Sequence, residues 1–302
     1  MCGLAGIILE KQDRSKKDID IIKSSFRDML IEADTRGGHA TGFAILDRQG
    51  GYLIYKRPVD AWRFFGSKDA YDVLDITYNN VTCIMGHTRY ATKGKPSINK
   101  NNHPIRAGNT IGTHNGSIHN HKELFRRYGM SRYAQVDSEA IFRLYETSQG
   151  AKDFADNRLP DVRGRVAIVW ADLEFPEYIY AVKANNPLKL VYVPSLRVFA
   201  YGSTMDIINA GFSNNYKHID IDKNTMIRIN TRTSRIRRKS IQITEPIQSN
   251  YYYDSKIGAY IKKSSHTVRN FVPRYSYSDL KQQNLFKKYK ALDGSTIKKV
   301  SK

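Results

Sequence analysis

Short apolar runs alternate with polar and glycine-containing segments along most of this 302-residue chain. Residues 2–9 are apolar on both faces, which predicts a buried strand. From Asp18 to Ala33 apolar residues recur at spacings of three and four, which predicts an amphipathic helix. Further strands are predicted at 43–47, 52–56, 81–87, 165–171, 178–183, 188–193, 198–201 and 226–229, and further helices at 61–74, 138–149 and 203–211.

Many short strands, a few amphipathic helices and no regular strand–helix alternation predict an α+β protein with mainly antiparallel sheets. Asn115-Gly116 predicts a hairpin turn, because this dipeptide favours the type I′ conformation. Asp137 or Ser138 is expected to cap the helix that follows it. Beyond about Glu245 the apolar density falls, which predicts a segment that is largely extended or disordered on its own.

The charge of the chain is concentrated near its C-terminus. The sequence holds 49 Lys and Arg against 29 Asp and Glu, and residues 231–302 account for 17 and 4 of these, or +13 of the total +20. Such an excess favours an anionic partner. No run of 18 apolar residues predicts a membrane span, and the first residues do not resemble a secretion signal. With only Cys2 and Cys83 there is no disulfide framework, so we expect a cytoplasmic protein.

Cys2 is the first candidate for chemistry. Removal of Met1 would leave a thiol, with an ordinary pKa of about 8.5, beside an α-amine of about 7.7–8.0. Such a residue carries both a nucleophile and its base. His114, His119 and His121 lie close together, but no Cys or second acidic cluster completes a set of metal ligands. We therefore expect neither a metal nor another cofactor.

Five segments that are rich in small, polar and histidine residues occur in a particular order along the chain. They are Met1–Gly3, Arg36–Gly42, Gly86–Gly94, His103–Asn120 and Val136–Glu139. In order and spacing they resemble class II glutamine amidotransferases, which are N-terminal-nucleophile hydrolases, and most of all the glutaminase domain of glucosamine-6-phosphate synthase. The resemblance covers about residues 2–230. It implies a four-layer αββα domain with two stacked antiparallel sheets at 2–240, followed by a basic, tyrosine-rich extension at 241–302.

The resemblance also assigns roles to individual residues. It implies that Cys2 attacks the side-chain amide of glutamine to form a γ-glutamyl thioester. The Asn115 side chain and the Gly116 N–H would form the oxyanion hole, a role that an outward-facing turn would also allow. Arg89 matches the residue that binds the α-carboxylate of glutamine, for which a bidentate guanidinium is suited. Asp137 matches the carboxylate that binds the α-amine.

Other matching positions lie around this pocket. Thr92 and His103 match lesser substrate-binding positions, and Arg36 and Gly37 match a glycine-rich loop that packs over the nucleophile. The chain also departs from the family pattern. His39 stands where the family usually has Asp, and Tyr90 and Lys93 replace the Trp and His of the sugar-phosphate enzyme. These departures affect the acceptor and the gating of the pocket more than the hydrolysis.

Nothing in the sequence matches a domain that would bind an ammonia acceptor, and no glycine-rich phosphate loop is present. We therefore expect a glutaminase subunit that supplies ammonia to an acceptor on a separate synthetase or acceptor-binding protein. Two alternatives stay open: a γ-glutamyl amidohydrolase, and an inactive relative that binds nucleic acid. The basic extension is compatible with nucleic-acid binding, with docking to an acidic partner, or with a solubilising role.

Overall fold

The computed structural model describes residues 2–75, 78–213, 215–244, 251–254 and 259–262. The chain divides into two compact units, 1–246 and 247–302. In the described part of the second unit, β14 (Tyr251–Asp254) pairs with β15 (Ala259–Lys262) in an antiparallel ladder. These two strands occur in a stretch for which the sequence predicts a largely extended or disordered chain. The rest of that stretch lies outside the described residues.

The first unit contains two sheets, and every ladder between their named strands is antiparallel. The first sheet has the order β11 (Lys217–Ile219), β9 (Lys189–Val193), β10 (Val198–Gly202), β1 (Gly3–Leu9), β4 (Val81–Arg89), β2 (Ala40–Asp47), β3 (Tyr52–Arg57). The second has the order β13 (Ile236–Ser240), β12 (Thr225–Asn230), β8 (Tyr178–Lys183), β7 (Gly164–Asp172), β6 (Thr110–Ile118), β5 (Ile105–Ala107).

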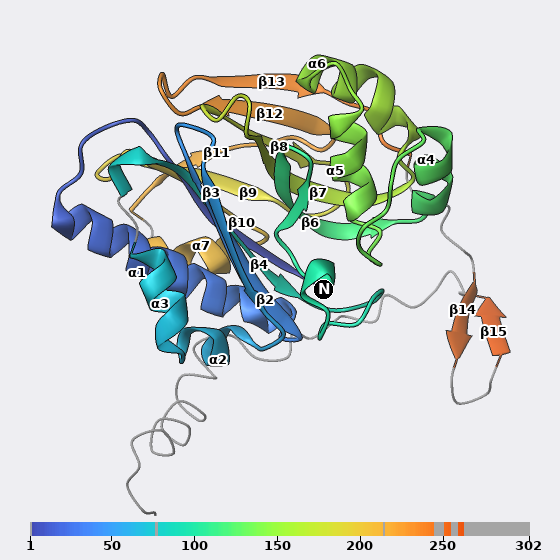
Figure 1. The fold of residues 1–302 in the computed structure, drawn as a ribbon, viewed down its shortest axis with the longest axis horizontal. Coiled ribbons are helices and arrows are strands. Elements are labelled where there is room, and N and C mark those ends of the chain that lie inside the picture. The colour runs from blue at the N-terminus through green and yellow to red at the C-terminus, as the bar shows by residue number, and fades with distance from the viewer. Residues whose placement is uncertain (1, 76–77, 214, 245–250, 255–258, 263–302) are drawn as a thin grey trace, which may run out of the picture. The chain divides into compact units, whose positions relative to one another are not determined.

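Helices cover the outer face of each sheet (Figure 1). The first sheet is covered by α1 (Lys16–Ala33), α2 (Ala61–Phe65), α3 (Lys68–Leu74) and α7 (Met205–Phe212). The second is covered by α4 (His121–Arg127), α5 (Glu139–Glu146), α6 (Ala151–Asp153) and a π-helical turn at Phe154–Arg158. Short 3₁₀ turns lie at Asp34–Arg36, Tyr78–Asn80, Asn99–Asn101 and Leu159–Asp161. The predicted α+β, four-layer αββα architecture is confirmed.

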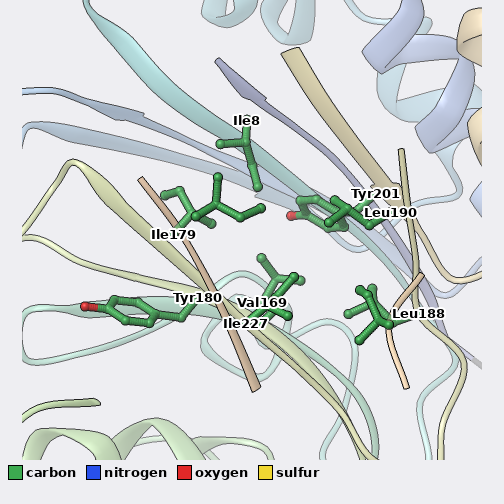
Figure 2. Close-up of a pocket in the computed structure, with 11 residues that line it drawn as sticks. Ile8, Val169, Ile179, Tyr180, Leu188, Leu190, Tyr201 and Ile227 are labelled. Carbon is green, nitrogen blue, oxygen red and sulfur yellow. The ribbon is translucent and has the colours of Figure 1, made fainter. Parts of the chain in front are cut away.

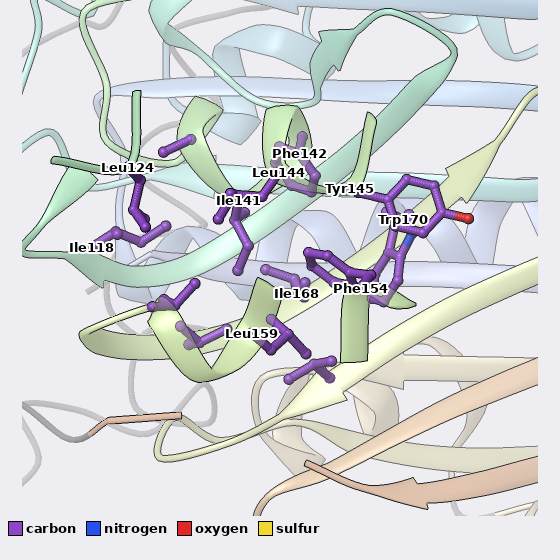
Figure 3. Close-up of a cluster of buried hydrophobic side chains, with 14 of the residues drawn as sticks. Ile118, Leu124, Ile141, Phe142, Leu144, Tyr145, Phe154, Leu159, Ile168 and Trp170 are labelled. Atoms are coloured by element: carbon purple, nitrogen blue, oxygen red, sulfur yellow. The ribbon is translucent and has the colours of Figure 1, made fainter. Parts of the chain in front are cut away.

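Three apolar layers hold these elements together. One lies between the first sheet and its helices, and a second lies between the two sheets. The third packs α5 and the π-helical turn on the second sheet, where Tyr145 and Phe154 meet the Trp170 ring edge to face (Figure 3). Such aromatic pairs contribute roughly 0.5–1.5 kcal/mol beyond the area they bury. The sheets are therefore fixed on both faces, as a rigid support for the loops at their ends.

The layer between the sheets contains a cavity of about 10 Å³ (Figure 2). Ile8 and Tyr201 of the first sheet face Val169, Ile179 and Ile227 of the second across it. A volume near the size of one water probe in an apolar lining holds no ligand. None of the predicted site residues lines this cavity, so it belongs to the core.

Most predicted elements are present, but three expectations need correction. Asn115-Gly116 lies inside β6 and does not form a hairpin turn. The predicted helix at 61–74 is two helices, α2 and α3. Ser138 is the residue before α5, yet neither its side chain nor that of Asp137 caps the helix, because Ser138 Oγ pairs with His114 and Asp137 accepts the Ile118 N–H.

Candidate active site

Cys2 lies directly before β1, the central strand of the first sheet. Gly3 is the register partner of Thr88 in β4, so Cys2 lies beside the end of β4. There the Tyr90 N–H donates to Cys2 Sγ at 3.3 Å, and the thiol faces the Tyr90 carbonyl at 3.6 Å. The strand pairing therefore holds the sulfur against the backbone that follows Arg89.

Asn115 connects the second sheet to this nucleophile. Its Nδ2 donates to the Cys2 carbonyl at 2.8 Å and to Ser203 Oγ at 2.7 Å. Ser203 Oγ also accepts the Leu4 N–H at 2.8 Å. The Asn115 side chain thus fixes the backbone on both sides of Gly3, and it is 3% exposed, so these bonds are shielded from water.

The Gly116 N–H points to the side of β6 on which β5 pairs only with Thr110–Gly112, so no described strand pairs with it there. It is paired in register with Val166, whose N–H donates to Asn185 Oδ1 and whose carbonyl accepts the Ala184 N–H. Antiparallel pairs alternate between bonded and non-bonded positions, so the Gly116 N–H points away from β7. Its φ is 147°, and a Cβ at this position would lie 1.8 Å from the Arg165 carbonyl oxygen. Only glycine fits here.

Arg89 ends β4 and is 3% exposed. Its Nη1 donates to Asn102 Oδ1 at 2.7 Å, and its Nη2 donates to the carbonyls of Lys93 and of Gly94, the latter at 2.8 Å. Asn102 Nδ2 in turn donates to the Pro96 carbonyl at 2.7 Å. The guanidinium is therefore held by the loop that follows its own strand.

Asp137 is 5% exposed and lies next to the free edge of β6. Its Oδ2 accepts the Ile118 N–H at 2.6 Å, and Lys93 Nζ lies 3.7 Å from the same oxygen. Ile118 is two residues beyond Gly116 on the same strand, so the two N–H groups point to the same side. This brings Asp137 and Gly116 to one edge, together with the Lys93 side chain.

The glycine-rich segment packs on the Arg89–Tyr90 peptide. A Cβ on Gly37 would lie 2.5 Å from the Tyr90 nitrogen, so no other residue allows this approach. Arg36 Nε donates to the Cys2 carbonyl at 3.0 Å. His39 accepts the Ala91 N–H at Nδ1 and stacks on Tyr90 with ring centroids 5.0 Å apart. His39 and Tyr90, two of the departures from the family pattern, therefore contact each other.

Electrostatics at the site oppose ionisation of the thiol. Burial raises the pKa of Cys2, and the Tyr90 N–H, Arg89 and Arg36 offset this in part. Burial lowers the pKa of Arg89, while the charges of Cys2 and Asp137 act in the opposite direction. A thiol with a raised pKa needs a base to become a nucleophile at neutral pH.

Two of the predicted site residues do not join this group. Thr92 is exposed on the loop after Arg89. His103 is buried, and its ring lies 4.2 Å from that of His87, centroid to centroid. Burial lowers the pKa of His103 well below its usual range and that of His87 to about 3, so both rings are neutral. The neighbour of His103, Asn102, is the residue that contacts Arg89.

Two of the three histidines that were considered as metal ligands, His114 and His119, have other partners. His114 pairs with Ser138 Oγ at 2.9 Å and with the Arg165 carbonyl at 3.1 Å, and His119 pairs with Ser117 Oγ at 3.1 Å. Within the described ranges, no three His, Cys, Asp or Glu side chains are grouped to hold a metal ion. Among the same residues, no helix is both long and apolar enough for a transmembrane span.

Sequence reasoning missed two residues that organise the site, Ser203 and Asn102. Both are fully or almost fully buried, at 0% and 1% exposure. Ser203 follows the apolar strand β10, and Asn102 lies among several Asn in a loop. A small polar residue directly after a buried strand was the one available signal for Ser203.

Comparison with known proteins shows which proteins this fold resembles. No protein-family model matches the chain. A solved glutamine phosphoribosylpyrophosphate amidotransferase from B. subtilis superimposes on 80% of the chain and 50% of its own length, with a TM-score of 0.58 and 18% identity. Over that region the chain therefore has the same fold as this amidotransferase.

Curated relatives agree with this assignment. Glutamine–fructose-6-phosphate aminotransferase of Encephalitozoon cuniculi is 27% identical over 215 residues, which are 65% of the chain and 30% of that enzyme. The 7-cyano-7-deazaguanine synthase of Sulfolobus acidocaldarius is 23% identical over 225 residues, 73% of the chain and 46% of that enzyme. The matched region spans less than half of each relative. These matches confirm the resemblance to class II glutamine amidotransferases, a class of enzymes.

Proposed function

We propose that this chain hydrolyses the side-chain amide of glutamine and supplies the ammonia to an acceptor. Cys2, freed by removal of Met1, attacks the amide carbon, and its α-amine takes the thiol proton. The carbonyl oxygen becomes an oxyanion that the Gly116 N–H and Asn115 Nδ2 stabilise, for which Nδ2 exchanges one of its two present hydrogen bonds for the oxyanion. The α-ammonium of Cys2 then passes its proton to the amide nitrogen, so that the intermediate collapses with release of ammonia and leaves the γ-glutamyl thioester. Water hydrolyses this thioester to glutamate and the free thiol.

The observation that carries this proposal is the convergence of distant segments on Cys2. Tyr90 contacts its sulfur, and Asn115 and Arg36 both donate to its carbonyl. Arg89 and Asp137 are the groups we propose for the α-carboxylate and the α-ammonium of glutamine. Arg36 and Gly37 hold the loop over the nucleophile, while Thr92 and His103 stay predictions as substrate-binding positions.

The deciding experiment compares Cys2→Ala with Cys83→Ala, because these two are the only cysteines of the chain. Cys83 is fully buried in β4, so its thiol is inert. We expect the native chain and Cys83→Ala to release glutamate from glutamine, and Cys2→Ala to release none. A glutamine-mimicking electrophile should add its mass to the peptide that begins with Cys2. Glutamate release by Cys2→Ala would falsify the mechanism.

We propose further that the acceptor is bound by a separate synthetase or acceptor-binding protein. The support is that residues 241–302 are basic and tyrosine-rich, a composition suited to docking on an acidic partner. Co-purification from native cells, followed by ammonia transfer assays with the recovered protein, tests this.

The cytoplasmic location of the protein also stays a prediction.

A further inference from the structure

Lys93 touches both charged groups that are proposed for the amino-acid end of glutamine. Its carbonyl accepts a hydrogen bond from Arg89 Nη2. Its ammonium lies 3.7 Å from Asp137 Oδ2. An α-amino acid bound in this pocket would make the same two kinds of contact, with an oxygen on the guanidinium and an ammonium on the carboxylate.

We infer that Lys93 is a specificity-determining residue, because its ammonium competes with the substrate α-ammonium for Asp137. This inference rests on the proposed function. The Asp137 carboxylate is 5% exposed, and Oδ2 already accepts the Ile118 N–H. A second ammonium beside the same oxygen would meet repulsion from Lys93 unless Lys93 moves away.

The geometry also limits how strong this competition is. The Lys93 side chain is 41% exposed, so solvent screens the pair, and its ammonium is free to swing outward. Exposed pairs of this kind contribute up to about 1 kcal/mol, which corresponds to roughly two- to fivefold in affinity. Lys93 therefore tunes the preference for substrates with an α-ammonium and does not block them.

A substrate without the α-ammonium does not need Asp137. The native pocket should consequently discriminate only modestly between glutamine and 5-amino-5-oxopentanoate, which has the same side-chain amide and carboxylate but no α-amine. Removing the Lys93 charge should favour glutamine and leave the deaminated compound unaffected. The ratio of the KM for glutamine to the KM for the deaminated compound is thus the quantity that reports on Lys93.

The test measures ammonia release from both compounds by the full chain, by Lys93→Ala and by the matched control Lys95→Ala, whose lysine is exposed two residues away. We expect Lys93→Ala to lower KM for glutamine about two- to fivefold, with little change in kcat and none in KM for the deaminated amide. Lys95→Ala should match the native chain. Equal shifts for both amides, or an unchanged KM for glutamine, would overturn the inference.

A binding arm separates this inference from the proposed function. Calorimetry with Cys2→Ala and with Cys2→Ala/Lys93→Ala measures glutamine affinity without turnover. Tighter glutamine binding in the double variant supports the inference, even if the native chain hydrolyses neither amide, a result that would defeat the proposed function alone. Equal affinities of the two variants would overturn the inference whatever the hydrolysis assay shows.

Discussion

At the scale of single residues, the site depends on one buried amide. Asn115 donates to the carbonyl of Cys2 and to Ser203 Oγ, which also accepts the Leu4 N–H. Removing the amide would take one of two donors from the Cys2 carbonyl and one from Ser203 Oγ, and so loosen the backbone on both sides of Gly3. The same amide is the proposed side-chain donor to the oxyanion. Its loss should therefore disturb the backbone around Cys2 in the resting enzyme and also weaken stabilisation of the transition state.

We expect Asn115→Ala to lower kcat for glutamine hydrolysis by about 10²–10³, the usual loss for one oxyanion donor. Ser203→Ala, which removes the anchor of Asn115 and the acceptor of the Leu4 N–H but keeps the amide itself, should cost less. Single-turnover glutamate release measures both variants, and thermal unfolding shows whether the fold survives. A loss below tenfold in a stably folded Asn115→Ala would rule out its role at the oxyanion.

Glu32 offers a prediction about stability against pH. It lies on α1 with 5% of its surface exposed, and burial, reinforced by the charge of Asp206, raises its pKa from 4.5 to about 7. Because the carboxyl pKa is higher in the folded state, the unfolded state loses this proton at a lower pH than the folded state does. The associated stability is therefore full below pH 4.5 and is lost as the pH rises through 7.

Glu32→Gln should accordingly raise the free energy of unfolding by about 1–3 kcal/mol at pH 8 and change it little at pH 4.5. Urea unfolding at the two pH values measures the difference. Asp20→Asn, exposed on the same helix, is the matched control and should show no such pH dependence. A gain that is equal at both pH values would contradict the assignment to ionisation.

The sequence predicted the candidate chemical groups better than the residues that hold them. Cys2, Asn115, Arg89 and Asp137 lie in motifs whose order resembles a family, so each could be picked out. The contacts that position them join residues far apart in sequence, such as Asn115 with Ser203, 88 positions away. Neither local pattern nor motif spacing encodes which buried polar side chain will meet another across two sheets.

At the scale of elements, the ends of β1, β4 and β2 and the free edge of β6 assemble the site. The failed prediction of a hairpin at Asn115-Gly116 has a clear cause. Asn-Gly is the strongest short hairpin signal, yet β6 continues through it because Gly116 supplies the φ of 147° beside the Arg165 carbonyl. Tertiary pairing with β7 outweighed the local turn preference. The predicted strands at 2–9 and 165–171 are present because their apolar runs are buried between layers.

Two adjacent glycines test the packing of the glycine-rich segment on β4. A Cβ on Gly37 would lie 2.5 Å from the Tyr90 nitrogen, whereas one on Gly38 would lie no closer than 3.4 Å to any atom. We expect Gly37→Ala to displace the Arg89–Tyr90 peptide and reduce kcat/KM at least tenfold, or about 1.4 kcal/mol. Gly38→Ala should stay within about twofold of the native value. Equal effects of the two would show that this contact does not position the nucleophile.

At the scale of the whole molecule, the pattern of apolar residues bears on the fold, whereas the net charge bears on binding partners. Apolar periodicity predicted an α+β protein with mainly antiparallel sheets, because sheets and helices bury their apolar faces against each other. The four layers were implied by the resemblance to class II glutamine amidotransferases. A large share of the charge lies outside the first unit, since residues 247–302 hold 12 Lys and Arg against 3 Asp and Glu, or +9 of the total +20. We infer that fold and hydrolysis depend on the first unit, while the excess charge serves interactions with anions.

Neutralising five lysines of the extension should therefore weaken binding to anions and leave glutamine hydrolysis unchanged. The variant changes Lys287, Lys288, Lys290, Lys298 and Lys299 to Gln, and its control changes the exposed Lys11, Lys17, Lys68, Lys95 and Lys122. Glutamine kcat/KM should stay within about twofold in the first variant. Its affinity for single-stranded RNA should fall more than that of the control, with the salt slope reduced by about 0.7 for each phosphate that a lysine no longer neutralises. Equal reductions in the two variants would mean that general surface charge, and not the extension, attracts the polyanion.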